Sequence, residues 1–223
     1  MWLWQISRFS QEGYYLIVPD IRGHGESSKS CNFSIKGCSE DLFNLLSYLN
    51  VEKTIIIGVS MGGLIAQRFA CDYEGRMKGL IISDSYSEVR SFRERMSGWI
   101  AYITMKISMG IFKKSLRSIY EGSTLQYFMD RISEMEKRQL LAIRAELNRF
   151  SITVELRQIE VPALIIVGDG MGGFPIRMAQ KTARAIKNAR MEVIEGSHDP
   201  SNMIKPVEFN KLAIEFIEEL NNR

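Results

Sequence analysis

The feature that most constrains this chain is an apolar run that ends in a serine flanked by glycines. Residues 54–59 read Thr-Ile-Ile-Ile-Gly-Val, Ser60 follows, and an amphipathic segment opens at Leu64. Ser60 lies between Gly58 and Gly62, whose missing side chains would let a strand turn sharply into a helix. The pattern predicts a strand, a nucleophile elbow at Ser60 and a helix. A glycine-serine-glycine turn also occurs as a plain connection, but the apolar and amphipathic flanks favour the elbow.

An elbow of this kind predicts nucleophilic chemistry. The first amides of a helix have no partner within it, so the N–H of Met61 is the candidate donor to an oxyanion formed by attack of Ser60. A serine hydroxyl needs a base, and an imidazole serves near neutral pH. His198 stands far downstream, in a loop between a predicted last strand and a predicted last helix. We therefore predict His198 as the base.

Composition excludes several classes of function. The chain has 223 residues, is 45% hydrophobic and carries a net charge of only +3 with its charges mixed, which predicts one core with an insertion and no nucleic-acid partner. With two histidines and no paired cysteine spacing, no metal site is expected. Three cysteines, Cys31, Cys38 and Cys71, fit reduced thiols. Without a signal peptide or a membrane-spanning run, a soluble cytoplasmic protein that binds no membrane is expected.

The order of elements predicts an α/β core interrupted by a helical insertion. Short apolar runs predict strands at 14–18, 79–83, 161–168 and 191–194, in addition to the run before Ser60. Between residues 85 and 150 the pattern is helical throughout. We therefore predict a core formed by residues 1–84 and 151–223, and a helical cap at 85–150. Its aromatic and methionine side chains, such as Trp99 and Met105, either line a site for an apolar substrate or pack the cap onto the core.

A second motif makes the resemblance specific. Residues 19–27 read Pro-Asp-Ile-Arg-Gly-His-Gly-Glu-Ser, and the serine elbow follows some thirty residues later. This combination resembles the α/β-hydrolase superfamily, in particular its esterases, enol-lactonases and carbon–carbon hydrolases with a helical cap. The resemblance covers nearly the whole chain and implies a mostly parallel sheet flanked by helices, a serine nucleophile and no cofactor. It also implies that His24 is structural and braces the elbow, although a second histidine in a serine hydrolase is a candidate base.

The acid of the predicted triad is less clearly marked. In the family it stands three residues after the glycine that ends the penultimate strand, and counting from Gly168 leads to Met171, which cannot serve. Two replacements remain open. Asp169 lies two residues earlier in the same loop, and Asp84 follows the strand at 79–83, where some members carry their acid. We favour Asp84, for which a role as a helix cap or turn residue is the competing interpretation.

The resemblance also predicts that strands are missing. Family members open with two or three strands before a segment like Trp4-Gln5, and the third ends in a His-Gly loop that supplies a second oxyanion amide. This absence is expected to leave a gap in mid-sheet, between the strand before Pro19 and the strand before Ser60. Those strands would pair directly or leave an exposed edge through which copies of the chain associate. A truncated reading of a longer gene is the expectation, with a naturally shortened hydrolase as the alternative.

The predicted function is that of a serine hydrolase that cleaves carboxylic ester or lactone bonds of a small, largely apolar substrate through an acyl-enzyme. Two alternatives stay open. One is a carbon–carbon bond hydrolase that uses the same residues. The other is non-catalytic: an impaired hydrolase fragment, or a protein of this fold that binds a small apolar ligand.

Overall fold

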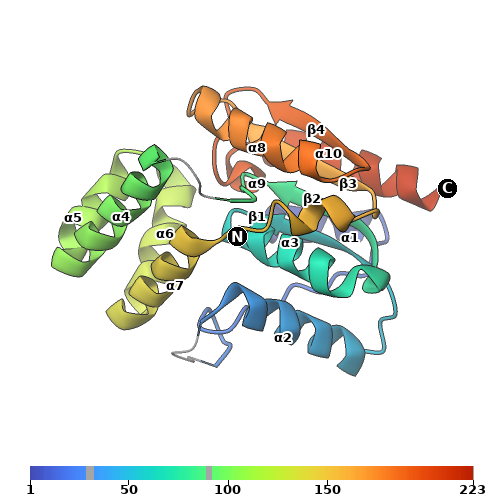
Figure 1. The fold of residues 1–223 in the computed structure, drawn as a ribbon, viewed down its shortest axis with the longest axis horizontal. Coiled ribbons are helices and arrows are strands. Elements are labelled where there is room, and N and C mark those ends of the chain that lie inside the picture. Colours follow the sequence, from blue (N-terminus) through green and yellow to red (C-terminus); the bar gives the residue numbers. More distant parts are fainter. Residues whose placement is uncertain (29–32, 89–91, 223) are drawn as a thin grey trace. The chain divides into compact units, whose positions relative to one another are not determined.

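The computed structural model describes residues 1–28, 33–88 and 92–222, and only the backbone of 92–94. Helices and strands alternate before and after a run of four helices (Figure 1). The elements are α1 (Leu3–Gln11), α2 (Ile35–Tyr48), β1 (Thr54–Val59), α3 (Met61–Tyr73), η1 (Glu74–Arg76), β2 (Met77–Ser83), α4 (Phe92–Ile107), α5 (Met109–Arg117), α6 (Gly122–Glu134), α7 (Lys137–Arg149), η2 (Glu155–Gln158), β3 (Ala163–Gly168), α8 (Gly173–Ala185), β4 (Ala189–Ile194), α9 (Ser201–Ile204) and α10 (Pro206–Asn221).

The chain divides into two compact units. The first comprises residues 1–18, 39–87 and 151–223, and therefore holds every strand. The second comprises residues 19–38 and 88–150, and holds α4 to α7. Helix α2 begins in the second unit and ends in the first.

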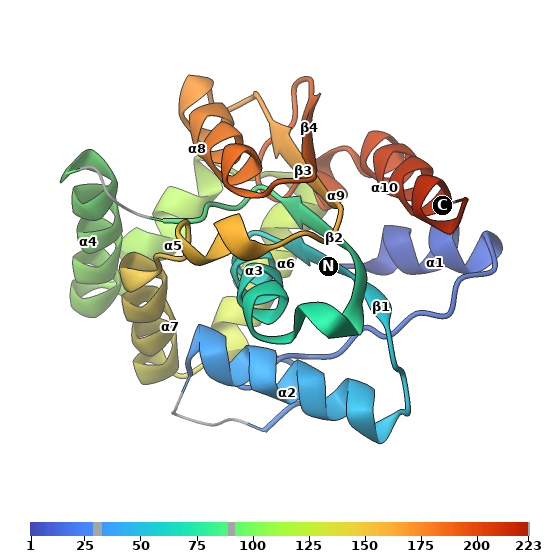
Figure 2. The same cartoon turned by 45° about the vertical axis from the view of Figure 1, so that its right-hand side comes forward.

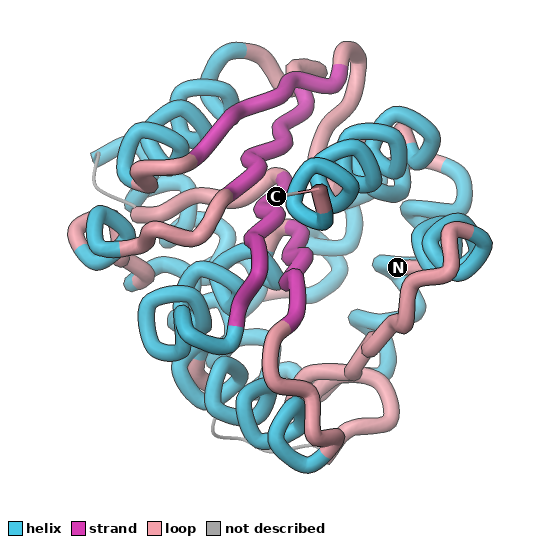
Figure 3. Tube along the Cα trace, turned by 90° about the vertical axis from the view of Figure 1, so that its right-hand side faces the viewer, coloured by secondary structure: helices cyan, strands magenta, loops and turns pink. Residues whose placement is uncertain are grey.

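In the first unit, the four strands form one parallel sheet in the order β1-β2-β3-β4 (Figure 3). The register pairs Val59 with Ser83 and Ser83 with Ile166, so β1 and β2 end at the same level, whereas β3 continues to Gly168 beside β4. Because the strands are parallel, the loops that follow them meet at one edge of the sheet, where open α/β sheets bind ligands. We call it the carboxyl edge; it holds Ser60, Asp84, Asp169 and residues 195–200.

Helices cover both faces of the sheet, which explains why β1, β2 and β3 are largely apolar. Helix α3 packs on β1 and β2, and α8 packs on β3 and β4 (Figure 2). On the other face, Ile81, Leu164 and Ile166 form a buried cluster with Phe209 and Phe216 of α10. Side chains alternate along a strand, so the equally buried Leu80, Ile82 and Ile165 point to the α3 and α8 face. The predicted parallel sheet flanked by helices is confirmed.

The predicted strand at residues 14–18 is wrong, although its alternation is present. Tyr14 and Leu16 pack against the core cluster while Tyr15 is 81% exposed. The segment nevertheless forms no ladder with any described strand, and β2 is the only strand that pairs with β1 in the described part of the chain. A short extended segment needs a hydrogen-bonded neighbour to become part of a sheet, and local alternation does not supply one. β1 is therefore an edge strand.

Buried amide side chains tie α1 to the C-terminal part of the chain. Gln5 is 3% exposed, and its Nε2 donates to Asn202 O at 3.0 Å and to Asn210 Oδ1 at 2.9 Å. In return, Asn202 Nδ2 donates to Gln5 Oε1 at 3.1 Å and to Met1 O at 3.2 Å. Because each amide offers both donors and acceptors, these bonds fix α1 against α9 and α10.

The second unit is built from helices that pack in pairs: α4 with α7, α4 with α5, and α5 with α6. Ile35 N donates to Glu146 Oε1 at 3.0 Å, and Gln139 Nε2 donates to Gly23 O, so residues 19–38 are tied to α7. Of the two cap side chains named in the sequence analysis, Met105 is buried, whereas Trp99 is 56% exposed.

Two further expectations concern cysteines and membranes. Cys38 and Cys71 form no disulfide among the described residues, and burial raises the pKa of the Cys71 thiol to about 12; Cys31 lies outside the described residues. Within the described ranges, we find no helix with the length and hydrophobicity needed to span a bilayer.

Candidate active site

Ser60 occupies a strained backbone position between β1 and α3. Its φ is 53° and its ψ is −120°, a region that residues with a side chain rarely adopt. The turn is tight because a Cβ on Gly58 would lie 2.3 Å from Gly62 O, so only glycine fits at 58. The predicted elbow is present. The predicted need for glycine at 62 is wrong, because a Cβ there meets nothing within 4 Å.

Backbone hydrogen bonds extend the sheet past the strand ends and place Ser60 beside the end of β2. Ser60 N donates to Ser83 O at 2.8 Å, and Asp84 N donates to Ile166 O at 2.9 Å. Asp84, like Ser60, has a positive φ, of 49°, which an aspartate tolerates better than most residues. The two side chains therefore leave the sheet at neighbouring positions of the carboxyl edge.

Asp84 is held on both carboxylate oxygens. Oδ1 accepts from Gly168 N at 3.1 Å and from Ser201 Oγ at 2.9 Å. Oδ2 accepts from Ser201 N at 2.7 Å and from Ser83 Oγ at 2.9 Å. Backbone N–H groups only donate, so Asp84 acts here as a firmly anchored acceptor.

The direct partner of the Ser60 hydroxyl is a carboxylate that the sequence did not single out. Ser60 Oγ donates to Asp199 Oδ2 at 2.8 Å. The other oxygen of Asp199, Oδ1, is buried and has no hydrogen-bond partner among the described residues. Burial, followed by the negative charge of Asp84, raises the pKa of Asp199 from its ordinary 3.8 to about 7, although the Ser60 hydrogen bond opposes this shift.

His198, the predicted base, lies next to Asp199 in the same loop. Its Nδ1 is 3.1 Å from the backbone oxygen of Asp199; because a carbonyl only accepts, this contact needs the proton on Nδ1. Ser197 O accepts from Gly170 N at 2.7 Å, and a Cβ on Gly168 would lie 2.3 Å from the Ser197 backbone. Glycine at 168 therefore lets this loop lie against the end of β3.

Asp169, the alternative acid, also reaches this loop. Its Oδ1 accepts from Gly196 N at 2.7 Å, which ties the loop after β3 to the loop after β4. Met171, at the position where the family resemblance placed the acid, is 53% exposed. The structure thus brings Ser60, Met61, Asp84, Asp169 and His198 to one edge, and adds Asp199.

His24 belongs to the second unit. Its Nδ1 lies 3.3 Å from Arg22 O, and its ring contacts Phe33. Burial lowers its pKa, while the contact with Arg22 O and the charge of Asp20 act in the opposite direction. These contacts lie within its own segment, and the bracing of the elbow by His24 stays a prediction.

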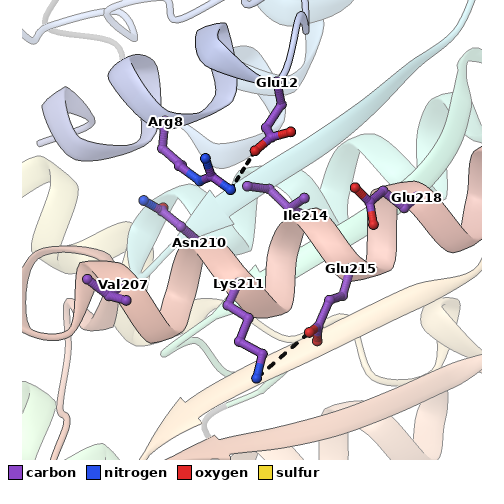
Figure 4. Close-up of a pocket in the computed structure, with 8 residues that line it drawn as sticks. All are labelled: Arg8, Glu12, Val207, Asn210, Lys211, Ile214, Glu215 and Glu218. Carbon is purple, nitrogen blue, oxygen red and sulfur yellow. Dashed lines mark ion pairs between the residues drawn. The ribbon is translucent and has the colours of Figure 1, made fainter.

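A surface groove lies elsewhere in the first unit, between α1 and α10 (Figure 4). We call it the α1/α10 groove; its volume is ≈390 Å³, and it is lined by Arg8, Glu12, Val207, Asn210, Lys211, Ile214, Glu215 and Glu218. None of these residues belongs to the carboxyl edge. In the ranges that the structure describes, no three histidine, cysteine or carboxylate side chains are grouped so that they could hold a metal ion.

Comparison with known proteins supports the fold and the family resemblance. The model of the alpha/beta hydrolase fold matches residues 1–104. A 3-oxoadipate enol-lactonase from Acinetobacter baylyi is 24% identical over 99% of this chain and 84% of its own length. The structure of an esterase from Exiguobacterium antarcticum superposes with a TM-score of 0.88 at 20% identity, covering 97% of this chain and 86% of the esterase. The chain has the α/β-hydrolase fold, and these relatives support its membership of the α/β-hydrolase superfamily.

A lactonase also has a similar structure. The enol-lactonase from Burkholderia xenovorans superposes with a TM-score of 0.83 at 20% identity, covering 97% of this chain and 85% of the lactonase. At this identity the likeness shows the fold, and the chemistry must be argued from the residues at the carboxyl edge.

Asp199 is the site residue that sequence reasoning missed. The loop at 195–200 lacks helical or strand periodicity, so nothing in the sequence decides whether residue 198 or residue 199 faces Ser60. The available signal was a second proton-accepting side chain directly beside the predicted histidine.

Proposed function

We propose that this chain is a serine hydrolase that cleaves carboxylic ester or lactone bonds of a small, largely apolar substrate. The observation that carries the proposal is the strained Ser60, whose hydroxyl donates to a buried carboxylate at 2.8 Å. A nucleophile at a strand-to-helix turn with an adjacent proton acceptor is the arrangement that acyl transfer needs. The esterase and enol-lactonase names of its relatives support the same bond class.

The reaction would proceed through an acyl-enzyme. Ser60 Oγ attacks the carbonyl carbon, and the carbonyl oxygen becomes an oxyanion near the start of α3. Met61 is the first residue of that helix, and its N–H would donate to the oxyanion. Water then attacks the acyl-enzyme and releases the acid. His198 and Asp199 are the candidate bases on the loop after β4, and Asp84 and Asp169 are the carboxylates that anchor the surrounding loops.

The test is hydrolysis of 4-nitrophenyl acetate and butyrate by the wild-type chain and by Ser60→Ala. We expect Ser60→Ala to lower kcat/KM by at least about 10³-fold, because the nucleophile is lost. Ser10→Ala, a change at an exposed position of α1, serves as the matched control and should keep the wild-type rate. Equal, near-background rates for wild type and Ser60→Ala would refute the proposal.

One observation favours a non-catalytic candidate. The hydroxyl of Ser60 donates to a carboxylate where the sequence predicts an imidazole, and a carboxylate is usually a weaker base. A protein of this fold that only binds a small apolar ligand would show a rise in Tm with ligand and no turnover that depends on Ser60. The same two variants separate the candidates.

A further inference from the structure

We propose that Asp199 is the catalytic base of this chain, and that its carboxylate takes the proton of Ser60 with Asp84 as the neighbouring negative charge. The inference rests on the proposed function and names a residue for the proton transfer. It replaces the histidine of the sequence prediction with a pair of carboxyl groups.

The geometry supports Asp199 directly. A base must lie within hydrogen-bond reach of the proton that it removes, and Asp199 Oδ2 already accepts the Ser60 hydroxyl at 2.8 Å. Asp199 Oδ1 is buried without a partner in the described part of the chain, so no other hydrogen bond stabilises the negative charge on this carboxyl. A carboxylate that is poorly stabilised has a stronger tendency to take up a proton.

The two carboxyl groups differ in their surroundings, and that difference assigns their roles. Asp84 accepts four hydrogen bonds from Ser83, Gly168 and Ser201, so its lone pairs are occupied. Asp199 has the Ser60 hydroxyl alone, and burial together with the Asp84 charge raises its pKa to about 7. A base with a pKa near the working pH transfers protons in both directions most effectively. Asp84 is therefore the firmly held acceptor, and Asp199 is the group that gains and loses the proton.

The proton and electron pairs balance over the cycle. As Ser60 Oγ forms a bond to the carbonyl carbon, its proton moves to Asp199 Oδ2 and the carbonyl π pair moves to the oxygen. The oxyanion re-forms the carbonyl, the bond to the leaving oxygen breaks, and Asp199 returns the proton to that oxygen. Water repeats the sequence on the acyl-enzyme and gives its proton to Asp199, which passes it back to Ser60.

The surrounding titratable groups are few. Asp84 approaches from the end of β2, His198 precedes Asp199 in its own loop, and Asp169 reaches Gly196 of that loop from the end of β3. Because Asp199 must be ionised to act as a base, kcat/KM should rise with pH through about 7. A carboxylate at its ordinary pKa would leave the rate flat between pH 5 and 8.

The experiment compares four variants with 4-nitrophenyl acetate: Asp199→Asn, Asp199→His, His198→Asn and the exposed control Asp41→Asn. Asparagine keeps the size and the hydrogen bonding of Asp199 but cannot accept the proton, so kcat should fall by about 10²–10⁴-fold. Histidine restores a base at the same place, so Asp199→His should exceed Asp199→Asn by at least tenfold. A purely structural role would give the reverse ranking. His198→Asn should cost less than tenfold, and Asp41→Asn should match wild type.

The outcomes separate the inference from the function on which it rests. If wild type depends on Ser60 but Asp199→Asn stays within threefold while His198→Asn loses more than 10²-fold, the inference is overturned and the proposed function stands. If wild type is no faster than Ser60→Ala, the proposed function fails. In that case Asp199 does not act as a base in the natural chain, whether or not Asp199→His gains turnover, and the inference fails with it.

Discussion

Carboxylates occur both at the carboxyl edge and in the α1/α10 groove, but their surroundings differ. In the groove, Arg8 pairs with Glu12 at 2.5 Å and Lys211 lies 3.9 Å from Glu215, with all four side chains at least 30% exposed (Figure 4). At the carboxyl edge, Asp84 and Asp199 have no ion-pair partner among the described residues, and hydrogen bonds alone hold them. Glu12 and Glu215 of the groove each have a cationic partner, whereas Asp84 and Asp199 have none among the described residues.

This difference indicates which of the two regions can perturb the pKa of a carboxyl group enough to be useful in catalysis. Water screens the groove pairs, and exposed ion pairs contribute about 0–1 kcal/mol to stability. Two carboxyl groups in a buried region repel each other, so one of them holds a proton more tightly than usual. Perturbed titration of that kind is typical of functional sites.

The largest change in stability and activity should come from adding a side chain at the tight turn between β1 and α3. Gly58→Ala places a Cβ 2.3 Å from Gly62 O, and the elbow must shift, so we expect a loss of about 3 kcal/mol or more in the free energy of unfolding together with loss of esterase activity. Gly62→Ala is the matched control, since its Cβ meets nothing within 4 Å. Urea unfolding of the two variants measures the difference, and similar losses would contradict the geometry.

An intermediate effect should come from removing the carboxyl group of Asp199. Folded Asp199 keeps its proton up to about pH 7, whereas the unfolded chain releases it near 3.8, so wild-type stability falls as pH rises between these values. Asp199→Asn removes this dependence, and the variant should gain about 1–3 kcal/mol over wild type on going from pH 4 to pH 8. Thermal unfolding at both pH values measures it. An Asn variant with the same pH dependence as wild type would show that Asp199 ionises normally.

The smallest effect should come from the groove. Lys211→Ala removes an exposed ion pair with a separation of 3.9 Å, so we expect a change of less than about 0.5 kcal/mol in the free energy of unfolding and no change in kcat/KM. High salt should reduce even that difference. A loss of activity in Lys211→Ala would show that the groove contributes to the site, and would remove the contrast between the two regions.

Much of the fold could be predicted from the sequence because each buried strand has a local apolar pattern that can be recognised without its neighbours. The runs before Ser60 and Asp84, and the run ending at Gly168, are apolar on both faces and end in turn residues. The segment at 14–18 shows where this reasoning ends. Its alternation is correct, but a strand also needs a neighbour, and pairing is a property of the whole chain.

The positions of the site residues on the fold could be predicted from the sequence, but the hydrogen bonds between their side chains could not. Ser60 and the carboxyl edge follow from motif and chain order, and Asp84 was placed correctly at the end of β2. The contact between Ser60 and Asp199 depends on which way an irregular loop turns, and that is set by distant positions such as Gly168 and Gly170. His198 as the base stays a prediction that the variants above can test.

The amide network around Gln5 has a consequence for how this protein would lose activity. Asn202, which binds Gln5, is the neighbour of Ser201, whose N–H and hydroxyl both hold Asp84. Local unfolding of α1 would therefore weaken the hydrogen bonds that hold Asp84, through Asn202 and Ser201, without any change in the sheet. Under mild denaturant, turnover should disappear while the circular dichroism of the strands and large helices is still intact, because a helix with few buried side chains, such as α1, opens at a lower free energy than a buried sheet.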